Sequence, residues 1–267
     1  MPSTTSMTGS AERWGPLWGS EARDWAANED QQRPTYEEAI RQVGVEDGAS
    51  VLDIGCGSGV FLRLAADRGA RAYGLDASEA LIEIARERVP DGDLRVGDME
   101  ALPWADDTFD FVTGFNSFFF ADDMTAALRE AGRVAKPGAP VVVQVWGRPE
   151  KNDLEAAKPV FRVYLPAPPP GSPPPHSNLA EPGVLERIVA TAGLTPERTF
   201  DTSWAYRYED DAALSRGMLA PGGLGVLAGE RRGELEAAIL EALAPYRTAS
   251  GGYVLENEWH YLVARAA

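Results

Sequence analysis

The sequence predicts an α/β protein with a mainly parallel sheet and helices on both of its faces. Short apolar runs rich in β-branched residues alternate along the chain with longer segments of helical periodicity. Three of the runs, at 51–54, 70–76 and 94–99, carry an acidic residue at or near their end. The chain has 267 residues, of which 44% are hydrophobic, and it can therefore bury a sizeable core. Alternation of this kind is typical of strands joined by crossover helices.

The expected elements can be placed in order along the chain. The first part contains a helix at 34–43, a strand at 51–54, a helix at 57–68, a strand at 70–76 and a helix at 77–88 with Ser78 as its cap. The middle contains a third strand near 94–99, a fourth strand at 109–115, a helix at 123–135, a turn at 137–138 and a fifth strand at 140–146. The last part contains a helix at 182–192 and strands at 197–208 and 252–265.

The turn after the first strand carries three glycines at alternate positions. Residues 51–59 read Val-Leu-Asp-Ile-Gly-Cys-Gly-Ser-Gly. Glycines let the backbone turn tightly and approach a ligand without a Cβ in the way. The crevice at the carboxyl end of the first strand is where such sheets bind nucleotides, so the turn indicates a nucleotide-like ligand. A dinucleotide fingerprint requires a glycine at position 60, where this chain has Val60.

This segment resembles the D-x-G-x-G-x-G signature of the class I S-adenosylmethionine (SAM) dependent methyltransferases, with Asp53 as the acid. Residues 102–115 closely match a stretch of the type 11 group of these enzymes, and the resemblance covers 45–147 strongly and the rest loosely. It implies a Rossmann-like seven-stranded sheet with an antiparallel hairpin at its C-terminal edge, an N-terminal helical segment and cap or lid insertions. It also implies SAM as cofactor, S-adenosylhomocysteine as product, and no metal.

Cofactor residues are carried over from this resemblance position by position. Asp76 lies about 20 residues past the glycines, where a carboxylate for ribose hydroxyls is expected. The pair Asp98 and Met99 takes the place that contacts the adenine in the resembled family. Cys56 is expected to be a small packing residue of the turn rather than a nucleophile. The full set is Asp53, Gly55, Cys56, Gly57, Gly59, Asp76, Ala77, Asp98, Met99, Phe115 and Trp18. Any one strand-end acid taken alone is also compatible with an ordinary helix cap or a surface carboxylate.

Three tryptophans mark the N-terminal segment. Trp14, Trp18 and Trp25 fall at i, i+4 and i+11, close to one helical face. Such a stripe usually means core packing. The resemblance offers an alternative, because an N-terminal segment of related enzymes closes over the cofactor. Trp18 and Trp25 would then shield the sulfonium or stack on the substrate through cation–π contact.

Two insertions interrupt the expected plan. The first, 148–180, is dense in proline from 166 to 175, which favours extended geometry, and we interpret 151–180 as a short helix plus a lid. A disordered loop or a docking site for a proline-binding domain is the alternative. The second, 209–250, has two amphipathic stretches interrupted by glycines at 222, 223 and 225, and is expected to cap the active site. The expected acceptor-pocket residues are Trp25, Phe119, Tyr164 and Tyr206.

The domain plan follows from these segments. We expect a disordered tail at 1–10, an N-terminal helical segment at 11–44, a SAM-binding core at 45–147, the proline-rich lid at 148–180, and the C-terminal part of the core at 181–267 with its helical cap.

The sequence gives the weakest indication for the catalytic residues. Methyl transfer is an in-line displacement that depends largely on alignment and desolvation, and a base is needed only if the acceptor must lose a proton. His176 in the proline-rich insertion and Asn116 just past the fourth strand are the two candidates. His260, in the last strand, is more typical of an edge hairpin. Residues 116–119 read Asn-Ser-Phe-Phe and depart from the N/D-P-P-[YF] motif of nucleobase methyltransferases, so base-flipping chemistry is not supported.

Charge and composition narrow the partners. The formal net charge is −16 and we find no basic stripe, which excludes nucleic acid as an expected partner. No stretch approaches the length of a membrane span and the N-terminus lacks a secretory signal pattern, so we expect a cytoplasmic protein. The single cysteine excludes an internal disulfide and a zinc cluster. We expect a monomer or a homodimer.

The sequence thus predicts a SAM-dependent methyltransferase that acts on a small, aromatic or heterocyclic metabolite through an N, O or C acceptor. The similarity to actinobacterial type 11 enzymes suggests a natural-product pathway by analogy. An NAD-dependent oxidoreductase is one rival, against which Val60 and the lack of a Tyr-x-x-x-Lys pair count. A non-catalytic SAM-binding module is the other, because the motifs report binding and not turnover.

Overall fold

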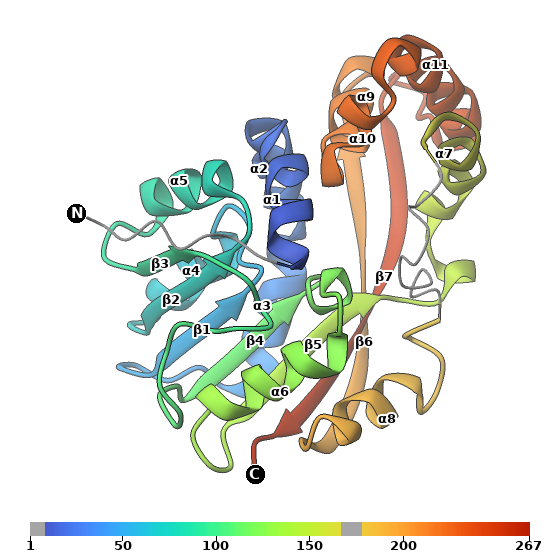
Figure 1. The fold of residues 1–267 in the computed structure, drawn as a ribbon. Helices are drawn as coiled ribbons and strands as arrows, with labels where there is room; N and C mark the ends of the chain where they lie inside the picture. Colours follow the sequence, from blue (N-terminus) through green and yellow to red (C-terminus); the bar gives the residue numbers. More distant parts are fainter. Residues whose placement is uncertain (1–8, 167–177) are drawn as a thin grey trace.

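A seven-stranded sheet in the order β3-β2-β1-β4-β5-β7-β6 runs through the molecule (Figure 1). The computed structural model describes residues 9–166 and 178–267. The strands are β1 (Ser50–Ile54), β2 (Arg71–Asp76), β3 (Asp93–Val96), β4 (Phe111–Phe115), β5 (Pro140–Trp146), β6 (Thr195–Tyr208) and β7 (Tyr253–Arg265). The helices are α1 (Ser10–Gly19), α2 (Ala22–Glu29), α3 (Arg33–Val43), α4 (Val60–Ala66), α5 (Glu79–Arg88), α6 (Met124–Val134), α7 (Lys158–Tyr164), α8 (Val184–Thr191), α9 (Asp211–Leu219), α10 (Leu224–Leu227) and α11 (Arg232–Leu243). The predicted α/β class and the Rossmann-like order are confirmed.

The first five strands are parallel, so their carboxyl ends meet at one edge of the sheet. The central strand β1 pairs with β2 on one side and β4 on the other, and Asp53 is in register with Gly74 and Thr113. Strand β2 in turn pairs with β3, with Asp76 beside Val96. This topology brings the strand-end acids of the sequence to a common edge.

Alternate residues of β1 serve two separate cores. Val51 packs into the cluster on the side of α3, α4 and α5, whereas Leu52 and Ile54 pack into the cluster on the side of α6 and α8. All three side chains are fully buried. Burial on both faces explains why β1 reads as a continuous apolar run rather than an alternating one.

Several helices begin later than the sequence predicts, and α4 and α5 show why. Helix α4 begins at Val60 rather than at 57. Gly57 and Gly59 have φ of 54° and 82°, in the left-handed region, so they belong to the turn and not to the helix. Helix α5 begins at Glu79 rather than at 77, and Ser78 is its cap as predicted, accepting a hydrogen bond from the backbone N–H of Leu81 at 3.3 Å.

Strands β6 and β7 form the predicted antiparallel hairpin and extend well beyond the rest of the sheet (Figure 1). Strand β5 pairs only with residues 259–265 of β7, so the part of β7 from 253 to 258 pairs with β6 alone. The insertion between these strands folds as α9, α10 and α11 at the far end of the hairpin, with Gly222 and Gly223 in left-handed geometry between α9 and α10. Helix α7 packs against α11.

The N-terminal segment is not one helix carrying a single stripe. It turns at Ser20 and Glu21, and α1 and α2 are separate helices. Trp18 and Trp25 therefore meet from two helices, with ring centroids 4.8 Å apart and an edge-to-face angle of 70°. Ser10, expected in the disordered tail, is the buried first residue of α1. Within the described ranges, no helix has the length and apolar character that crossing a membrane requires.

Candidate cofactor and acceptor site

Hydrogen bonds to strand β2 hold the glycine turn in place. The backbone N–H groups of Gly55 and Cys56 both donate to the carbonyl of Leu75, at 2.7 and 3.0 Å. The backbone N–H of Gly57, the next glycine of the turn, donates to Asp76 Oδ2 at 2.9 Å. The turn and the carboxylate at the end of β2 thus form one hydrogen-bonded unit.

Asp76, the predicted ribose ligand, accepts backbone hydrogen bonds through both of its carboxylate oxygens. Its Oδ1 accepts from the N–H of Ser78 at 2.8 Å, and burial raises the pKa of the carboxyl above its ordinary value. Each carboxylate oxygen can accept a further hydrogen bond. Ala77 lies beside it, and its carbonyl packs so closely on Gly15 of α1 that a Cβ there would lie 2.3 Å from the oxygen.

Asp53 lies behind the turn and is 3% exposed. Its Oδ1 accepts a hydrogen bond of 2.8 Å from the hydroxyl of Thr113 on β4. Burial raises the pKa of this carboxyl, and the negative charges of Glu29 and Asp76 raise it further. Two buried acids of the sheet edge therefore lack a full counter-charge, which favours a cationic ligand.

Asp98 and Met99 follow β3 at the carboxyl edge of the sheet. The carboxylate of Asp98 accepts from the backbone N–H of Ala11 at 3.3 Å and from the hydroxyl of Ser10 at 3.4 Å. The start of α1 therefore covers the predicted adenine end of the site. Met99 is half-buried against the core cluster under α6.

Trp18 belongs to α1, the helix whose Gly15 packs on Ala77. Its ring meets Phe120 edge-to-face, with centroids 5.4 Å apart, and it also contacts Trp25. Phe119 packs on Phe120 with centroids 4.8 Å apart. These aromatic rings join the N-terminal helices to the turn after β4.

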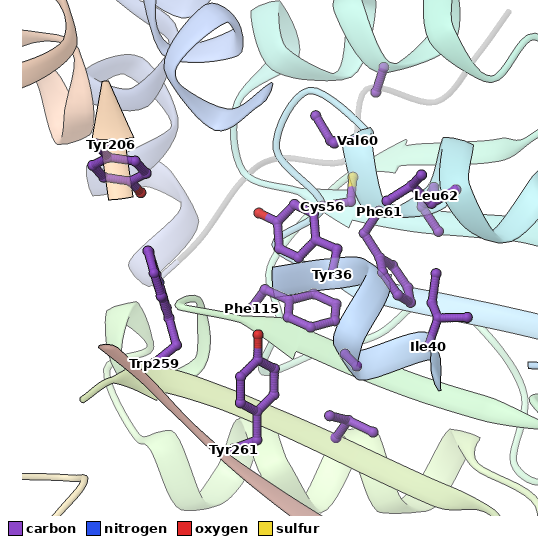
Figure 2. Close-up of a cluster of buried hydrophobic side chains, with 14 of the residues drawn as sticks. Tyr36, Ile40, Cys56, Val60, Phe61, Leu62, Phe115, Tyr206, Trp259 and Tyr261 are labelled. Atoms are coloured by element: carbon purple, nitrogen blue, oxygen red, sulfur yellow. The ribbon is translucent and has the colours of Figure 1, made fainter. Parts of the chain in front are cut away.

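A second aromatic group gathers at the end of β4, with rings from α3 and α4. Phe115 packs between Tyr36 and Phe61, at centroid distances of 4.8 and 4.6 Å. Figure 2 shows Tyr206 and Trp259 on the other side of this group, and their ring centroids are 5.8 Å apart. The indole Nε1 of Trp259 is buried and has no hydrogen-bond partner within the described part of the chain.

Asn116 has an unusual backbone and an unpaired oxygen. Its φ of 50° lies in the left-handed region, which asparagine tolerates better than most residues. Its Nδ2 donates to Gln144 Oε1 at 3.2 Å, and Gln144 Nε2 donates to the hydroxyl of Tyr261 at 2.6 Å. Asn116 Oδ1 is buried without a partner among the described residues.

Tyr164 and His260 lie apart from the glycine turn, whereas Cys56 is part of it. His176 falls outside the described residues. Tyr164 on α7 stacks under the guanidinium of Arg231, 4.3 Å from its ring centroid, within the helical cap. His260 pairs with Asp201 through Nδ1 at 2.6 Å on β6 and β7. Cys56 is 2% exposed and its sulfur lies against Gly74, in keeping with a packing role.

Sequence reasoning missed one residue of the glycine turn's surroundings. Glu29, the last residue of α2, places its carboxylate against Gly57, where a Cβ would lie 2.8 Å from Glu29 Oε2. Ser58 donates to the same oxygen from both its N–H and its hydroxyl, at 2.9 and 2.7 Å. Within the described ranges, no group of His, Cys, Asp and Glu side chains is arranged to hold a metal ion.

Comparison with known proteins identifies the domain. A family model described as a methyltransferase domain matches residues 52–143, which hold the glycine turn and both acids. Residues 52–143 of this chain match a type 11 methyltransferase domain. The demethylmenaquinone methyltransferase of Bacillus subtilis (strain 168) is 36% identical over 144 residues, which are 51% of this chain and 61% of that protein. The chain thus matches less than two thirds of the length of this relative.

Solved structures show the same fold as the methyltransferase domain and its surroundings. The YcgJ protein of Bacillus subtilis has a TM-score of 0.57 and 20% identity, covering 86% of this chain and 97% of its own. The cyclase SpnF also has a TM-score of 0.57 and 20% identity, covering 87% of this chain and 80% of its own. A fold shared with a cyclase does not by itself decide the reaction.

The residues present are suited to SAM. Gly55, Gly57 and Gly59 carry no side chains of their own and lie against Ser117, Glu29 and Ala85. Asp76 offers acceptors for the ribose, and Asp98 accepts hydrogen bonds from the N–H and hydroxyl groups at the start of α1. Asp53 and Glu29 supply negative charge where a positively charged methionine group would lie. The hydrogen-bonding groups and charges at this sheet edge therefore fit the cofactor that the matched domain implies.

Proposed function

We propose that this chain is a SAM-dependent methyltransferase that methylates a small, aromatic or heterocyclic metabolite at an N, O or C atom. One observation carries the proposal: the glycine turn of the methyltransferase domain and the buried acids Asp53 and Asp76 meet at one sheet edge. The bound cofactor would supply an electrophilic methyl group on a sulfonium.

The chain's own contribution to the reaction would be alignment and exclusion of water. Trp18, Phe120 and Trp25 are packed edge to face beside the turn that follows β4. Phe115 at the end of β4 and Tyr36 of α3 form an apolar wall. Holding the two reactants in line in a dry site can supply a large share of the rate enhancement.

The aromatic surroundings support an aromatic or heterocyclic acceptor. Tyr206, Trp259 and Trp146 are mutually packed, with Trp146 and Trp259 stacked at 5.4 Å. The unpaired Nε1 of Trp259 is a donor for a polar atom of an acceptor. The Bacillus subtilis relative bears the name of a quinone methyltransferase, and a quinol is accordingly one acceptor worth testing.

Asn116 and His176 remain the candidates for orienting or deprotonating the acceptor. The unpaired Oδ1 of Asn116 is an acceptor for a hydroxyl or amine proton of the substrate. It cannot itself take up a proton at neutral pH, so it would orient the acceptor rather than act as a base. His176 lies outside the described residues, and its role is left to mutagenesis.

The test has two stages. First, calorimetric titration with S-adenosylhomocysteine should show micromolar binding, with NAD as the control ligand; binding of NAD alone would contradict the proposal. Second, incubation with methyl-labelled SAM and a panel of demethylated quinols, phenols and heterocyclic amines should transfer label to one class, detected by mass spectrometry. Cofactor binding without transfer to any member of a broad panel would favour a non-catalytic SAM-binding module.

A further inference from the structure

Glu29 reaches from the N-terminal segment into the glycine turn. It ends α2 and is 4% exposed, although the neighbouring Asp30 is exposed. Both hydrogen-bond donors of Ser58 converge on Oε2, at 2.9 and 2.7 Å. Within the described part of the chain, Oε1 accepts no hydrogen bond. One oxygen is therefore anchored, and the other has lone pairs to offer to a ligand.

The charge around Glu29 is negative. Asp76 is near enough to raise the pKa of Glu29, and Glu29 in turn raises the pKa of Asp53. Arg88 is the cation that acts on Glu29, but its guanidinium is already paired with both oxygens of Asp30, at 2.7 and 3.0 Å. Three buried carboxylates at one turn call for a positive charge that the described residues supply only in part.

We propose that Glu29 is a cofactor-binding residue that pairs with the ammonium group at the methionine end of SAM. This inference rests on the proposed function, because it requires that the site takes SAM. The ligand brings an ammonium and a sulfonium into a turn where three carboxylates meet, and Ser58 holds the Glu29 carboxylate in place. The α2 helix thereby becomes part of the cofactor site instead of a cover that only packs on it.

The pairing predicts a dependence of cofactor affinity on pH. Burial raises the pKa of Glu29 to about 7. Below that pH the free protein holds a proton on Glu29, and binding of a cation must release it, so affinity should rise as the pH increases toward 7.5. The groups that act on this carboxyl are Ser58, Arg88 and Asp76. The groups whose own pKa Glu29 raises are Tyr36, Asp53, Cys56 and Tyr206.

The experiment compares two ligands on two variants of the full chain. S-adenosylhomocysteine carries the ammonium group, and 5′-methylthioadenosine lacks the whole amino-acid part. Calorimetry at pH 7.5 should show that Glu29→Gln weakens binding of S-adenosylhomocysteine by about ten-fold to one hundred-fold, the usual worth of a hydrogen bond to a charged group. Binding of 5′-methylthioadenosine should stay within about two-fold of the unsubstituted protein. Glu37→Gln, the same change on exposed Glu37 of α3, is the matched control and should alter neither affinity.

A second arm repeats the titrations at pH 5.5. The unsubstituted protein and Glu37→Gln should bind S-adenosylhomocysteine about ten-fold more weakly at pH 5.5 than at pH 7.5. Glu29→Gln should show a much smaller change, and what remains reports Asp53 and Asp76. Because a merely structural role would affect both ligands alike, the contrast between the ligands identifies the pairing.

Each result that contradicts the expectation leads to a different conclusion. If Glu29→Gln binds S-adenosylhomocysteine as well as the unsubstituted protein does, the pairing is wrong and the proposed function stands. If the variant binds more tightly, Glu29 occupies space that the ligand needs, and the pairing is equally overturned. Equal losses for both ligands would assign Glu29 to the packing of α2. If the unsubstituted protein binds neither ligand, the proposed function itself fails, and the pairing with it.

Discussion

The hydroxyl of Thr113 on β4 donates to the buried carboxylate of Asp53 on β1 across 2.8 Å, and the two residues are in register in the sheet. The same hydroxyl also lies 3.2 Å from the carbonyl of Leu52. The bond lowers the pKa of Asp53 against the larger effect of burial, which raises it. Thr113 therefore makes an ionised acid tolerable behind the glycine turn.

Replacing Thr113 with valine should test this relationship. Valine keeps the shape but removes the donor, so Asp53 is left with an unsatisfied buried oxygen. We expect Thr113→Val to lower the free energy of unfolding by about 1 to 3 kcal/mol. The loss should be larger at pH 8 than at pH 5.5, because only the ionised carboxyl needs the donor in full. Urea denaturation at the two pH values measures both quantities, and a loss independent of pH would attribute the effect to packing.

Gly57 should tolerate no side chain. Alanine there would meet the Glu29 carboxylate at 2.8 Å and would also have to adopt a φ of 54°. Gly48 separates these two effects, because its φ is 75° and nothing lies within 4 Å of an added Cβ. Both substitutions should cost about 1 kcal/mol of stability through backbone strain, and Gly57→Ala should lose more because its Cβ also meets the Glu29 carboxylate. Only Gly57→Ala should also lower affinity for S-adenosylhomocysteine, by at least about ten-fold; equal affinities in the two variants would mean that the glycines are only a turn.

Asp76 should contribute to cofactor affinity through its free lone pairs. Asp76→Ala removes the proposed acceptor for the ribose hydroxyls and releases the N–H of Gly57, so calorimetry should show a loss of roughly 1.5 to 3 kcal/mol in the binding of S-adenosylhomocysteine. Asp91→Ala is a suitable control, since Asp91 is exposed and precedes β3 at the amino-terminal edge of the sheet. An unchanged affinity in Asp76→Ala would remove this acid from the site.

Local sequence patterns predicted the strands that are buried on both faces of the sheet. The continuous apolar run of β1 and the β-branched run of β5 require a sheet covered by helices, and the glycines after β1 require a turn. Ser78 was recognisable as a cap because its position before an apolar periodic segment defines that role. These signals lie within a few residues of each other, which is why the sequence alone contains them.

Contacts between distant segments left no such signal. Glu29 stands in a polar run from 28 to 32, and nothing in that run distinguishes it from its neighbours. Its hydrogen-bond partner in the glycine turn, Ser58, lies 29 residues away. The break between α1 and α2 was missed for the same reason, since Trp18 and Trp25 fit one helical face in sequence but pack across two helices in space. The aromatic pair of Tyr206 and Trp259 forms only when β6 and β7 come together.

Glu29 should also make the stability of the free protein depend on pH. A carboxyl whose pKa rises from 4.5 to about 7 on folding favours the folded state when protonated. Its contribution is therefore complete below pH 4.5 and is lost as the pH rises through 7, which amounts to about 3 kcal/mol. Glu29→Gln keeps an acceptor for Ser58 without the charge, so it should gain stability relative to the unsubstituted protein between pH 5 and pH 8. Glu37→Gln should follow the unsubstituted protein over the same range. Urea denaturation in steps of one pH unit gives the two curves, and parallel curves for Glu29→Gln and the unsubstituted protein would show that Glu29 titrates as an ordinary exposed acid.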